Sequence, residues 1–333
     1  MRAMRLNKPK PVEEAPLELV DLPVQEPGAG MLRLRVKACG VCHTDLHIVE
    51  GDIHPPHLPI TPGHQVVGIV DAIGEELLPA PVQIGDRVGV PWLYWTDGTC
   101  GFCRRGEQNL CPNARFTGFD VDGGFADYML AHTGFVLSLP ESIPDEAAAP
   151  LLCAGIIGYR SLRQADLQPG ERLGLIGFGA SAHLAIQVAR YWGCEVYVFT
   201  RAKQHRQHAL ELGAAWAGGL EDEAPSLVDR AIIFAPSGLL VPTTLEKIRP
   251  GGTLAINAVY MSDIPQMPYR LIYGERTLRS VANATYQDGV EFLQLAAEIP
   301  VQADTSVYPL EDANRALVDL KYSKLNGEAV LVM

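Results

Sequence analysis

The chain has 333 residues, of which 47% are apolar and 20% are charged, and its net charge is −12. This length and composition predict a soluble globular protein of about two domains. The acidic balance disfavours a nucleic-acid partner, because proteins that bind phosphate backbones usually carry a basic face. The longest nearly apolar run, 147–159, is too short to span a bilayer, so we expect no membrane partner.

The seven cysteines bear on the compartment. The N-terminal residues contain no apolar core of a secretory signal, and an odd number of cysteines in a long chain does not suit a disulfide framework. We therefore expect a cytoplasmic protein with reduced thiols, some of which hold a metal.

The N-terminal part of the chain predicts a mostly β domain over 1–148. Residues 31–38 alternate apolar and basic side chains, which is typical of a half-buried strand. Further short strands, each set between Gly and Pro turns, are expected at 63–70, 85–90 and 125–130.

The following part, 149–285, predicts a doubly wound parallel sheet. Asp145 is placed to cap a helix that continues to about Arg163, and apolar strand patterns then alternate with helical patterns. Strands are expected at 173–177, 196–200, 231–235, 253–259 and 278–282, and helices at 181–192 and 203–212. A return segment, 286–333, predicts helices at 287–298 and 311–321 and a last strand at 328–333.

The stretch 38–47 gathers two thiols, two imidazoles, a hydroxyl and a carboxylate in ten residues. Thiolate and imidazole are ligands that zinc prefers, and a hydroxyl beside a second imidazole suits a proton relay. Taken alone, Cys39-x-x-Cys42 fits equally well half of a structural zinc site, a redox pair or buried inert thiols.

A second cluster lies in a glycine-containing loop with three cysteines, Cys100, Cys103 and Cys111. Three thiolates leave one vacancy in a tetrahedral zinc site, and Asp97 precedes Cys100 by the same three-residue step that separates the first two cysteines. A carboxylate oxygen can fill that vacancy. The loop therefore predicts a structural zinc, with a metal-free loop of reduced thiols as the alternative.

The run Gly177-Phe178-Gly179-Ala180-Ser181-Ala182 follows an apolar strand and opens a helix. In this setting the glycines allow a pyrophosphate to approach the helix N-terminus, which indicates dinucleotide binding. The third glycine of the usual pattern is replaced by Ala182, and a plain tight turn of an α/β domain is the alternative.

Together these motifs resemble one family. Gly40–Asp45, Gly63-His64, Asp97 to Cys111, Cys153-Ala154-Gly155 and Gly177–Ala182 stand in the order and spacing of zinc-dependent alcohol dehydrogenases of the medium-chain dehydrogenase/reductase superfamily. The chain is most similar to the bacterial, yeast-like branch. The resemblance implies an α/β protein in which both chain ends build a GroES-like, mostly β catalytic domain around a Rossmann domain, and it implies homodimers or homotetramers.

The resemblance also implies two zinc ions per chain. Besides the structural site, Cys42, His64 and Cys153 match the ligands of a catalytic zinc, although they are far apart in sequence. Asp45 matches a carboxylate that supports His64.

Further roles follow from the same resemblance. Thr44 matches the hydroxyl that takes the substrate proton, and His47 matches the end of the relay that passes it to solvent. Trp92 matches an aromatic side chain of the substrate pocket, and His43 matches a position near the cofactor pyrophosphate. Cys39 matches no metal position and is expected to pack in the core.

Three positions depart from the family pattern around these sites. Asp97 stands where the family usually has Cys, and Gln65 stands where it has Glu after the ligand histidine. Glu328 aligns with a family Arg that can touch the pyrophosphate. Cofactor binding is therefore expected to depend mainly on the 177–182 turn and on neighbours such as His43.

A fourth departure bears on the choice of cofactor. NAD-specific Rossmann domains end their second strand with a carboxylate, whereas this chain has Thr200 followed by Arg201. Nothing there repels a ribose 2′-phosphate, and both side chains can donate hydrogen bonds to it. NADP is therefore favoured over NAD, with dual use expected. The alternative is that Arg201 stacks on the adenine and NAD binds acceptably.

We predict a zinc-dependent enzyme that reversibly oxidises small primary alcohols to aldehydes and transfers the hydride to NAD(P). One alternative is an NADPH-dependent aldehyde reductase of the cinnamyl type. Another is a non-catalytic zinc protein, against which both the acidic charge and the complete ligand and relay set argue.

Overall fold

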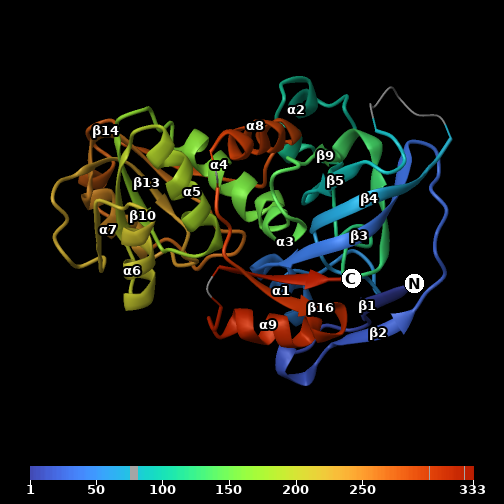
Figure 1. The fold of residues 1–333 in the computed structure, drawn as a ribbon. Coiled ribbons are helices and arrows are strands. Elements are labelled where there is room, and N and C mark those ends of the chain that lie inside the picture. The colour runs from blue at the N-terminus through green and yellow to red at the C-terminus, as the bar shows by residue number, and fades with distance from the viewer. Residues whose placement is uncertain (76–81, 300, 326) are drawn as a thin grey trace. The chain divides into compact units, whose positions relative to one another are not determined.

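The computed structural model describes residues 1–75, 82–299, 301–325 and 327–333. The chain forms two compact units, which can be followed by colour in Figure 1. The first unit combines Met1–Cys153 with Ala284–Met333, and the second unit consists of Ala154–Asn283. Both ends of the chain contribute to the first unit, because its last strand pairs antiparallel with an early one.

A sheet of seven strands organises the first unit. In hydrogen-bonded order its strands are β16 (Thr305–Pro309), β17 (Glu328–Val332), β3 (Met31–Val41), β4 (Gln65–Ile73), β5 (Arg87–Val90) and β9 (Leu137–Ser138), with β8 (Tyr128–His132) paired to β3. Two small sheets join β1 (Arg2–Leu6) to β2 (Leu17–Asp21) and β6 (Leu93–Trp95) to β7 (Arg115–Phe116).

Short helices connect these strands. The α-helices of the first unit are α1 (His43–Glu50), α2 (Gly101–Arg104), α3 (Asp145–Ala148), α8 (Tyr286–Glu298) and α9 (Ala313–Lys321). Its 3-10 helices are η1 (Val12–Glu14), η2 (Gln108–Leu110), η3 (Thr133–Phe135), η4 (Pro150–Leu152) and η6 (Leu310–Asp312). Within the described ranges, no helix has the length and apolar character needed to cross a membrane.

Strand β3 carries the chain to the site. Leu32 and Leu34 are fully buried and alternate with more exposed side chains, which confirms the predicted half-buried strand. The strand continues to Val41, and its last residues are all buried. Cys39 is one of them, in agreement with a packing role, and the chain then turns into α1 at Cys42.

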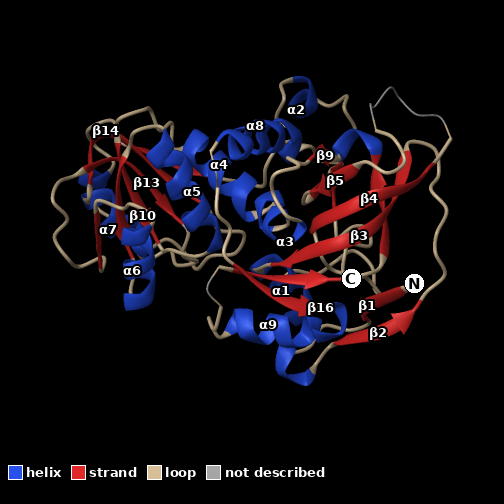
Figure 2. Cartoon of the chain, viewed as in Figure 1, coloured by secondary structure: helices blue, strands red, loops and turns tan. Residues whose placement is uncertain are grey.

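The second unit is a doubly wound parallel sheet, as predicted. Its order is β12 (Trp216–Gly218), β11 (Glu195–Phe199), β10 (Arg172–Ile176), β13 (Val228–Ile233), β14 (Ile248–Ile256) and β15 (Thr277–Ser280). Its helices are α4 (Ala154–Gln164), α5 (Ala180–Tyr191), α6 (Lys203–Glu211), α7 (Leu240–Glu246) and η5 (Tyr269–Leu271), and Figure 2 shows them around the strands. The strand order reverses between β10 and β13, the kind of switch point where such sheets bind ligands.

The structure corrects one predicted helix, 145–163. The chain there forms α3, then η4, and α4 begins only after Cys153. Pro150 causes the break, because its ring removes a backbone N–H and cannot be placed in a helix interior. Asp145 does not cap this segment; its carboxylate pairs with Arg87 at 2.7 Å. The break leaves Cys153 in an irregular turn between two helices.

Candidate metal and cofactor sites

Three ligand-type side chains from separate segments meet in the first unit. Cys42 precedes α1, His64 precedes β4, and Cys153 lies between η4 and α4. The two Sγ atoms and a ring nitrogen of His64 all lie within 4.8 Å of one another, and Cys42 Sγ is 3.2 Å from His64 Nε2. Ligand atoms of one tetrahedral zinc stand about 3.5–3.8 Å apart, so three donors this close, one pair of them slightly closer, can converge on a single ion.

The electrostatics of this cluster call for a cation. The neighbouring Cys153 thiol and then burial raise the pKa of Cys42 well above its ordinary value. Two thiols this close ionise together only when positive charge compensates them. A divalent metal supplies that charge, and two sulfur donors with one imidazole favour zinc.

Asp45 links the segments that carry two of these donors. Its side chain is fully buried, and its Oδ2 accepts a hydrogen bond from the Cys42 backbone N–H at 3.0 Å. Its Oδ1 accepts one from the Gly63 N–H at 3.0 Å and lies 3.1 Å from His64 Nδ1. The carboxylate therefore holds the imidazole proton on Nδ1, which leaves the Nε2 lone pair beside Cys42.

Thr44 and His47 lie three residues apart on α1, so their side chains share one face of the helix. Thr44 is buried, whereas the His47 side chain is 23% exposed. Sequence reasoning missed a third residue, Asp52, whose Oδ2 lies 2.8 Å from His47 Nδ1. The one signal for it was an Asp just after Gly51, which ends α1 in the left-handed conformation and turns the chain back.

Aromatic rings stand next to the His64 ligand position. Trp92 packs edge-on against the His64 ring, with centroids 5.0 Å apart. Phe116 stacks on Trp92 at 5.0 Å, and Phe119 tilts against it at 5.9 Å. The family resemblance predicted Trp92 as a pocket residue. The two phenylalanines were missed, because they lie on β7 and in the turn after it, and no spacing rule connects those segments to Trp92.

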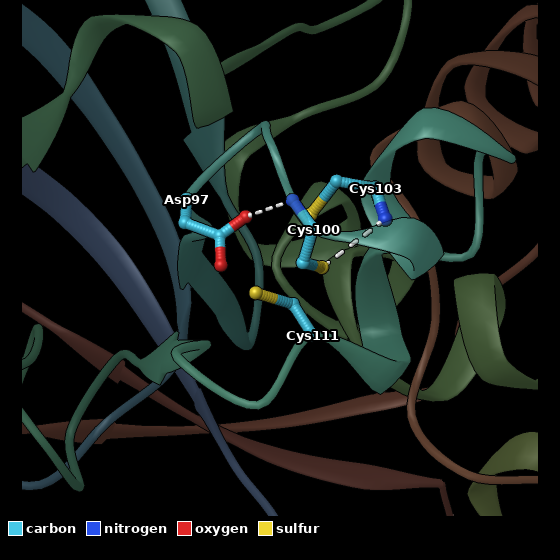
Figure 3. A group of neighbouring side chains, drawn as sticks. All are labelled: Asp97, Cys100, Cys103 and Cys111. Atoms are coloured by element: carbon cyan, nitrogen blue, oxygen red, sulfur yellow. Dashed lines mark hydrogen bonds between the residues drawn. The ribbon is translucent and has the colours of Figure 1, made fainter.

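The second cluster closes within one loop. Figure 3 shows Asp97, Cys100, Cys103 and Cys111 turned toward a common space. One ligand-type atom from each lies within 4.8 Å of the others, so all four members predicted from the sequence come together. Cys111 is buried and the other three are partly exposed. Three sulfurs and one oxygen at these separations fit a tetrahedral zinc.

The Asp97 carboxylate is fixed on both oxygens. Its Oδ1 accepts the backbone N–H groups of Thr99 and Cys100, each at 2.9 Å, and its Oδ2 accepts the Asn113 side-chain amide at 2.8 Å. These hydrogen bonds hold the pKa of Asp97 far below its usual range, and the bond from the Cys100 N–H has the largest effect. Asp97 is therefore an oriented carboxylate. Sequence reasoning missed Asn113, because only the folded conformation of the loop brings Asn113 next to Asp97.

In the second unit, the predicted dinucleotide turn joins β10 to α5. Gly177 has φ +90°, and a Cβ there would stand 3.2 Å from Ala235 N, so glycine is required. Gly179 precedes α5, where an added Cβ would meet nothing within 4 Å. The turn follows β10 at the switch point and leads into the backbone N–H groups of Ala180, Ser181 and Ala182, which suits a phosphate.

Thr200 directly follows the last residue of β11, as the sequence predicts, and is buried. Its N–H donates to Gly218 O at 2.8 Å, and its carbonyl accepts Arg206 Nε at 2.8 Å. Arg206 thus holds the strand end, while Arg201 is exposed. In the first unit, His43 is the first residue of α1 and is also exposed.

Two of the departures from the family pattern prove to be partners. The Gln65 Nε2 amide on β4 donates a hydrogen bond to Glu328 Oε1 on β17, and both residues are buried. Sequence reasoning treated them separately because 263 positions divide them.

Comparison with known proteins agrees with the fold. The profile "Alcohol dehydrogenase GroES-like domain" matches residues 28–141, and "Zinc-binding dehydrogenase" matches residues 182–298. A Mycobacterium tuberculosis protein named "Probable alcohol dehydrogenase AdhA" is 45% identical over 100% of this chain and 97% of its own length. An alcohol dehydrogenase of Geobacillus stearothermophilus is 32% identical over 95% of this chain and 96% of its own length.

Solved structures support the same fold. A cinnamyl alcohol dehydrogenase of Sorghum bicolor superposes with a TM-score of 0.90 at 27% identity, covering 99% of this chain and 97% of that one. The predicted pairing of a GroES-like domain with a Rossmann domain is confirmed by this likeness and by the two profile matches.

Proposed function

Because the chain belongs to the zinc-dependent alcohol dehydrogenases of the medium-chain dehydrogenase/reductase superfamily, we propose that it oxidises small primary alcohols reversibly to aldehydes and transfers the hydride to NAD(P). The observation that carries this proposal is the meeting of Cys42, His64 and Cys153 with a buried carboxylate behind the histidine. We place the enzyme in the cytoplasm, as a homodimer or homotetramer.

In this proposal Cys42, His64 and Cys153 hold a catalytic zinc, and the fourth position is open to water or substrate. When bound, zinc would supply the Lewis acidity that lowers the pKa of the substrate hydroxyl. Asp45 is a positioning residue. By accepting a hydrogen bond from the Nδ1–H group it keeps the His64 Nε2 lone pair available as a ligand.

Oxidation of an alcohol to an aldehyde releases one hydride, which reduces NAD(P)⁺, and one proton. We propose that Thr44 takes the proton from the substrate hydroxyl and that His47 passes it to solvent. His47 is suited to this step because an imidazole can accept and release protons, and the Asp52 carboxylate can orient the ring by accepting a hydrogen bond from Nδ1. The partial exposure of His47 puts solvent within reach.

We propose that the cluster of Trp92, Phe116 and Phe119 limits the size of the substrate. Trp92 contacts the His64 ring and is backed by Phe116 and Phe119, so an apolar wall stands beside the proposed metal. Such a wall favours short alkyl chains and contributes about 1–3 kcal/mol of discrimination per methylene.

Asp97, Cys100, Cys103 and Cys111 are proposed to hold a second, structural zinc, which gives two zinc ions per chain. Beside α2 and η2 the loop has little regular structure, and five of the six residues 101–106 are exposed, so a metal would replace a missing core.

For the cofactor we propose that the Gly177–Ala182 turn holds the pyrophosphate and that Thr200 and Arg201 contact the adenine ribose. His43 is proposed as a further cofactor-binding residue. NADP is favoured over NAD because Thr200 replaces a carboxylate that would repel a 2′-phosphate, and Arg201 is exposed to meet one. The test is kcat/KM for both cofactors with one alcohol. A tenfold preference for NAD would contradict this part of the proposal.

The likeness to the Sorghum cinnamyl alcohol dehydrogenase favours one competing substrate class, NADPH-dependent reduction of cinnamyl-type aldehydes. Steady-state rates with ethanol, 1-propanol and cinnamyl alcohol, and with their aldehydes, separate the two. Our proposal predicts higher kcat/KM for the short alcohols. A preference for cinnamaldehyde with NADPH supports the competing class, and a protein that binds zinc without NAD(P)-dependent turnover refutes both.

A further inference from the structure

A side-chain pair bridges three strands behind the His64 segment. In the sheet, Gln65 of β4 lies opposite Gly40 of β3, and Gly40 lies opposite Val330 of β17. The Gln65 side chain crosses over Gly40, where an added Cβ would stand only 2.7 Å from its Nε2. It thereby reaches Glu328, two residues before Val330, and donates a hydrogen bond to Oε1.

The two remaining side-chain oxygens of this pair lack hydrogen-bond donors. Gln65 is fully buried and Glu328 is 1% exposed, yet Gln65 Oε1 and Glu328 Oε2 both lack a hydrogen-bond partner within the described residues. If Glu328 is ionised, Gln65 Oε1 and Glu328 Oε2 are both buried hydrogen-bond acceptors, and neither has a donor within the described residues. An unsatisfied buried group costs about 1–3 kcal/mol, and more if it is charged.

Burial outweighs the surrounding charges at Glu328. It raises the pKa of Glu328 to about 8, and the hydrogen bond from Gln65 and the charge of His64 only partly oppose it. The neighbouring Asp45 carboxylate acts in the same direction as burial, because it disfavours a second anion.

One proton satisfies both atoms. We propose that Glu328 is a neutral carboxylic acid that forms a cyclic pair with the Gln65 amide, in which Gln65 Nε2–H donates to Oε1 and the carboxyl O–H donates to Gln65 Oε1. We further propose that this pair positions His64, because Gln65 follows it directly and the pair fixes the start of β4 to β17. The second statement rests on the zinc site proposed above, whereas the first does not.

Infrared spectroscopy of the zinc-loaded protein tests the cyclic pair. The spectrum of the wild type minus that of E328Q at pH 7 is expected to contain the C=O stretch of a protonated carboxyl group, shifted on exchange into D2O. A difference spectrum with only carboxylate bands would overturn the proposal. This measurement does not depend on catalysis or on which ligands hold the metal.

Variants test the positioning role. Glu328→Gln keeps two complementary hydrogen bonds with Gln65, so zinc affinity at the catalytic site and the visible spectrum of the cobalt-substituted site should stay close to wild type. Glu328→Leu leaves the Gln65 amide unpaired, and we expect a loss of about 10-fold in zinc affinity together with an altered cobalt spectrum.

Leu331→Ala is the matched control, since Leu331 is fully buried and lies on the opposite face of β17 from Glu328. It should lower the melting temperature and leave the cobalt spectrum unchanged. Equal spectra for E328L and L331A would refute positioning by Glu328. If instead no variant or wild type binds metal at Cys42, His64 and Cys153, the proposed function fails, while the infrared result still decides the cyclic pair.

Discussion

The two metal-type clusters of the first unit are built in opposite ways. Cys42, His64 and Cys153 come from three distant segments, and a fully buried carboxylate joins two of them. The loop cluster from Asp97 to Cys111 comes from one short segment and is held by its own backbone N–H groups and Asn113. The first cluster can form only when the sheet is folded. The 97–111 loop, in contrast, is expected to stay ordered only when its four side chains hold a metal. Removing a ligand should therefore affect activity in the first case and stability in the second.

The sharpest test of this contrast compares Cys153→Ala with Cys111→Ala. We expect Cys153→Ala to lose one zinc per chain and all measurable alcohol oxidation while its melting temperature changes little. Cys111→Ala should lose the other zinc and a large part of its thermal stability, with residual turnover at low temperature. Metal analysis, melting curves and initial rates check both. Cys39→Ala, a buried thiol outside both clusters, is the control and should keep two zinc ions.

The proposed proton relay of Thr44 and His47 accompanies the first cluster, since both residues lie on α1 directly after Cys42. Replacing His47 by Gln should slow alcohol oxidation about 10²-fold, because a positioned acid–base group is lost. The deficit should grow as the pH falls, where solvent is a poorer proton acceptor. Asp52→Asn removes only the partner of Nδ1 and should cost less. A pH–rate profile that H47Q leaves unchanged would exclude His47 from the relay.

The groups that orient ligands should show the same contrast at smaller magnitude. Asp45→Asn should weaken the catalytic zinc by about 10- to 100-fold, as expected for a partner of a ligating histidine. Asn113→Ala should weaken the structural zinc, by no more than this, and lower the melting temperature without changing kcat. Zinc titration against a chelator measures both. A loss of kcat in N113A as large as that in D45N would break the separation of the two clusters.

The two clusters also differ in their dependence on pH, because the sheet-supported cluster has the buried pair of the Gln65 amide and the Glu328 carboxyl group behind it. Burial raises the pKa of Glu328 to about 8, so its contribution to folding stability is present at low pH and is lost as the pH rises toward 8. The slope is at most about 1.4 kcal/mol per pH unit. E328Q should remove it, so E328Q should gain stability over wild type between about pH 5 and 8 in denaturant titrations. An equal pH dependence in both proteins would contradict a raised pKa.

The same difference in construction decides what the sequence could reveal. The loop cluster was visible in the spacing from Asp97 to Cys111, because one segment carries all four groups. The ligand set of the first cluster needed the resemblance, since no spacing rule links Cys42 to Cys153. The partners that depend on tertiary contacts stayed hidden: Asp52, Asn113 and the pairing of Gln65 with Glu328.

The fold shows a similar limit. The alternation of apolar and basic residues predicted β3, and the alternation of apolar strand segments with helical segments predicted the parallel sheet of the second unit, because both patterns reflect burial directly. The edge strands β12 and β16 were missed, since they are short and only partly buried. The helix predicted over 145–163 was broken by Pro150, a local signal that the apolar run around it obscured.

Anomalous diffraction at the zinc edge, from crystals of the wild-type protein, would show whether two zinc ions bind and whether one of them lies between Cys42, His64 and Cys153. We expect two peaks per chain, one with Zn–S distances of about 2.3 Å to Cys42 and Cys153 and a Zn–N distance of about 2.0–2.1 Å to His64 Nε2. A single peak, or a metal bound by Cys39 in place of Cys42, would contradict this expectation.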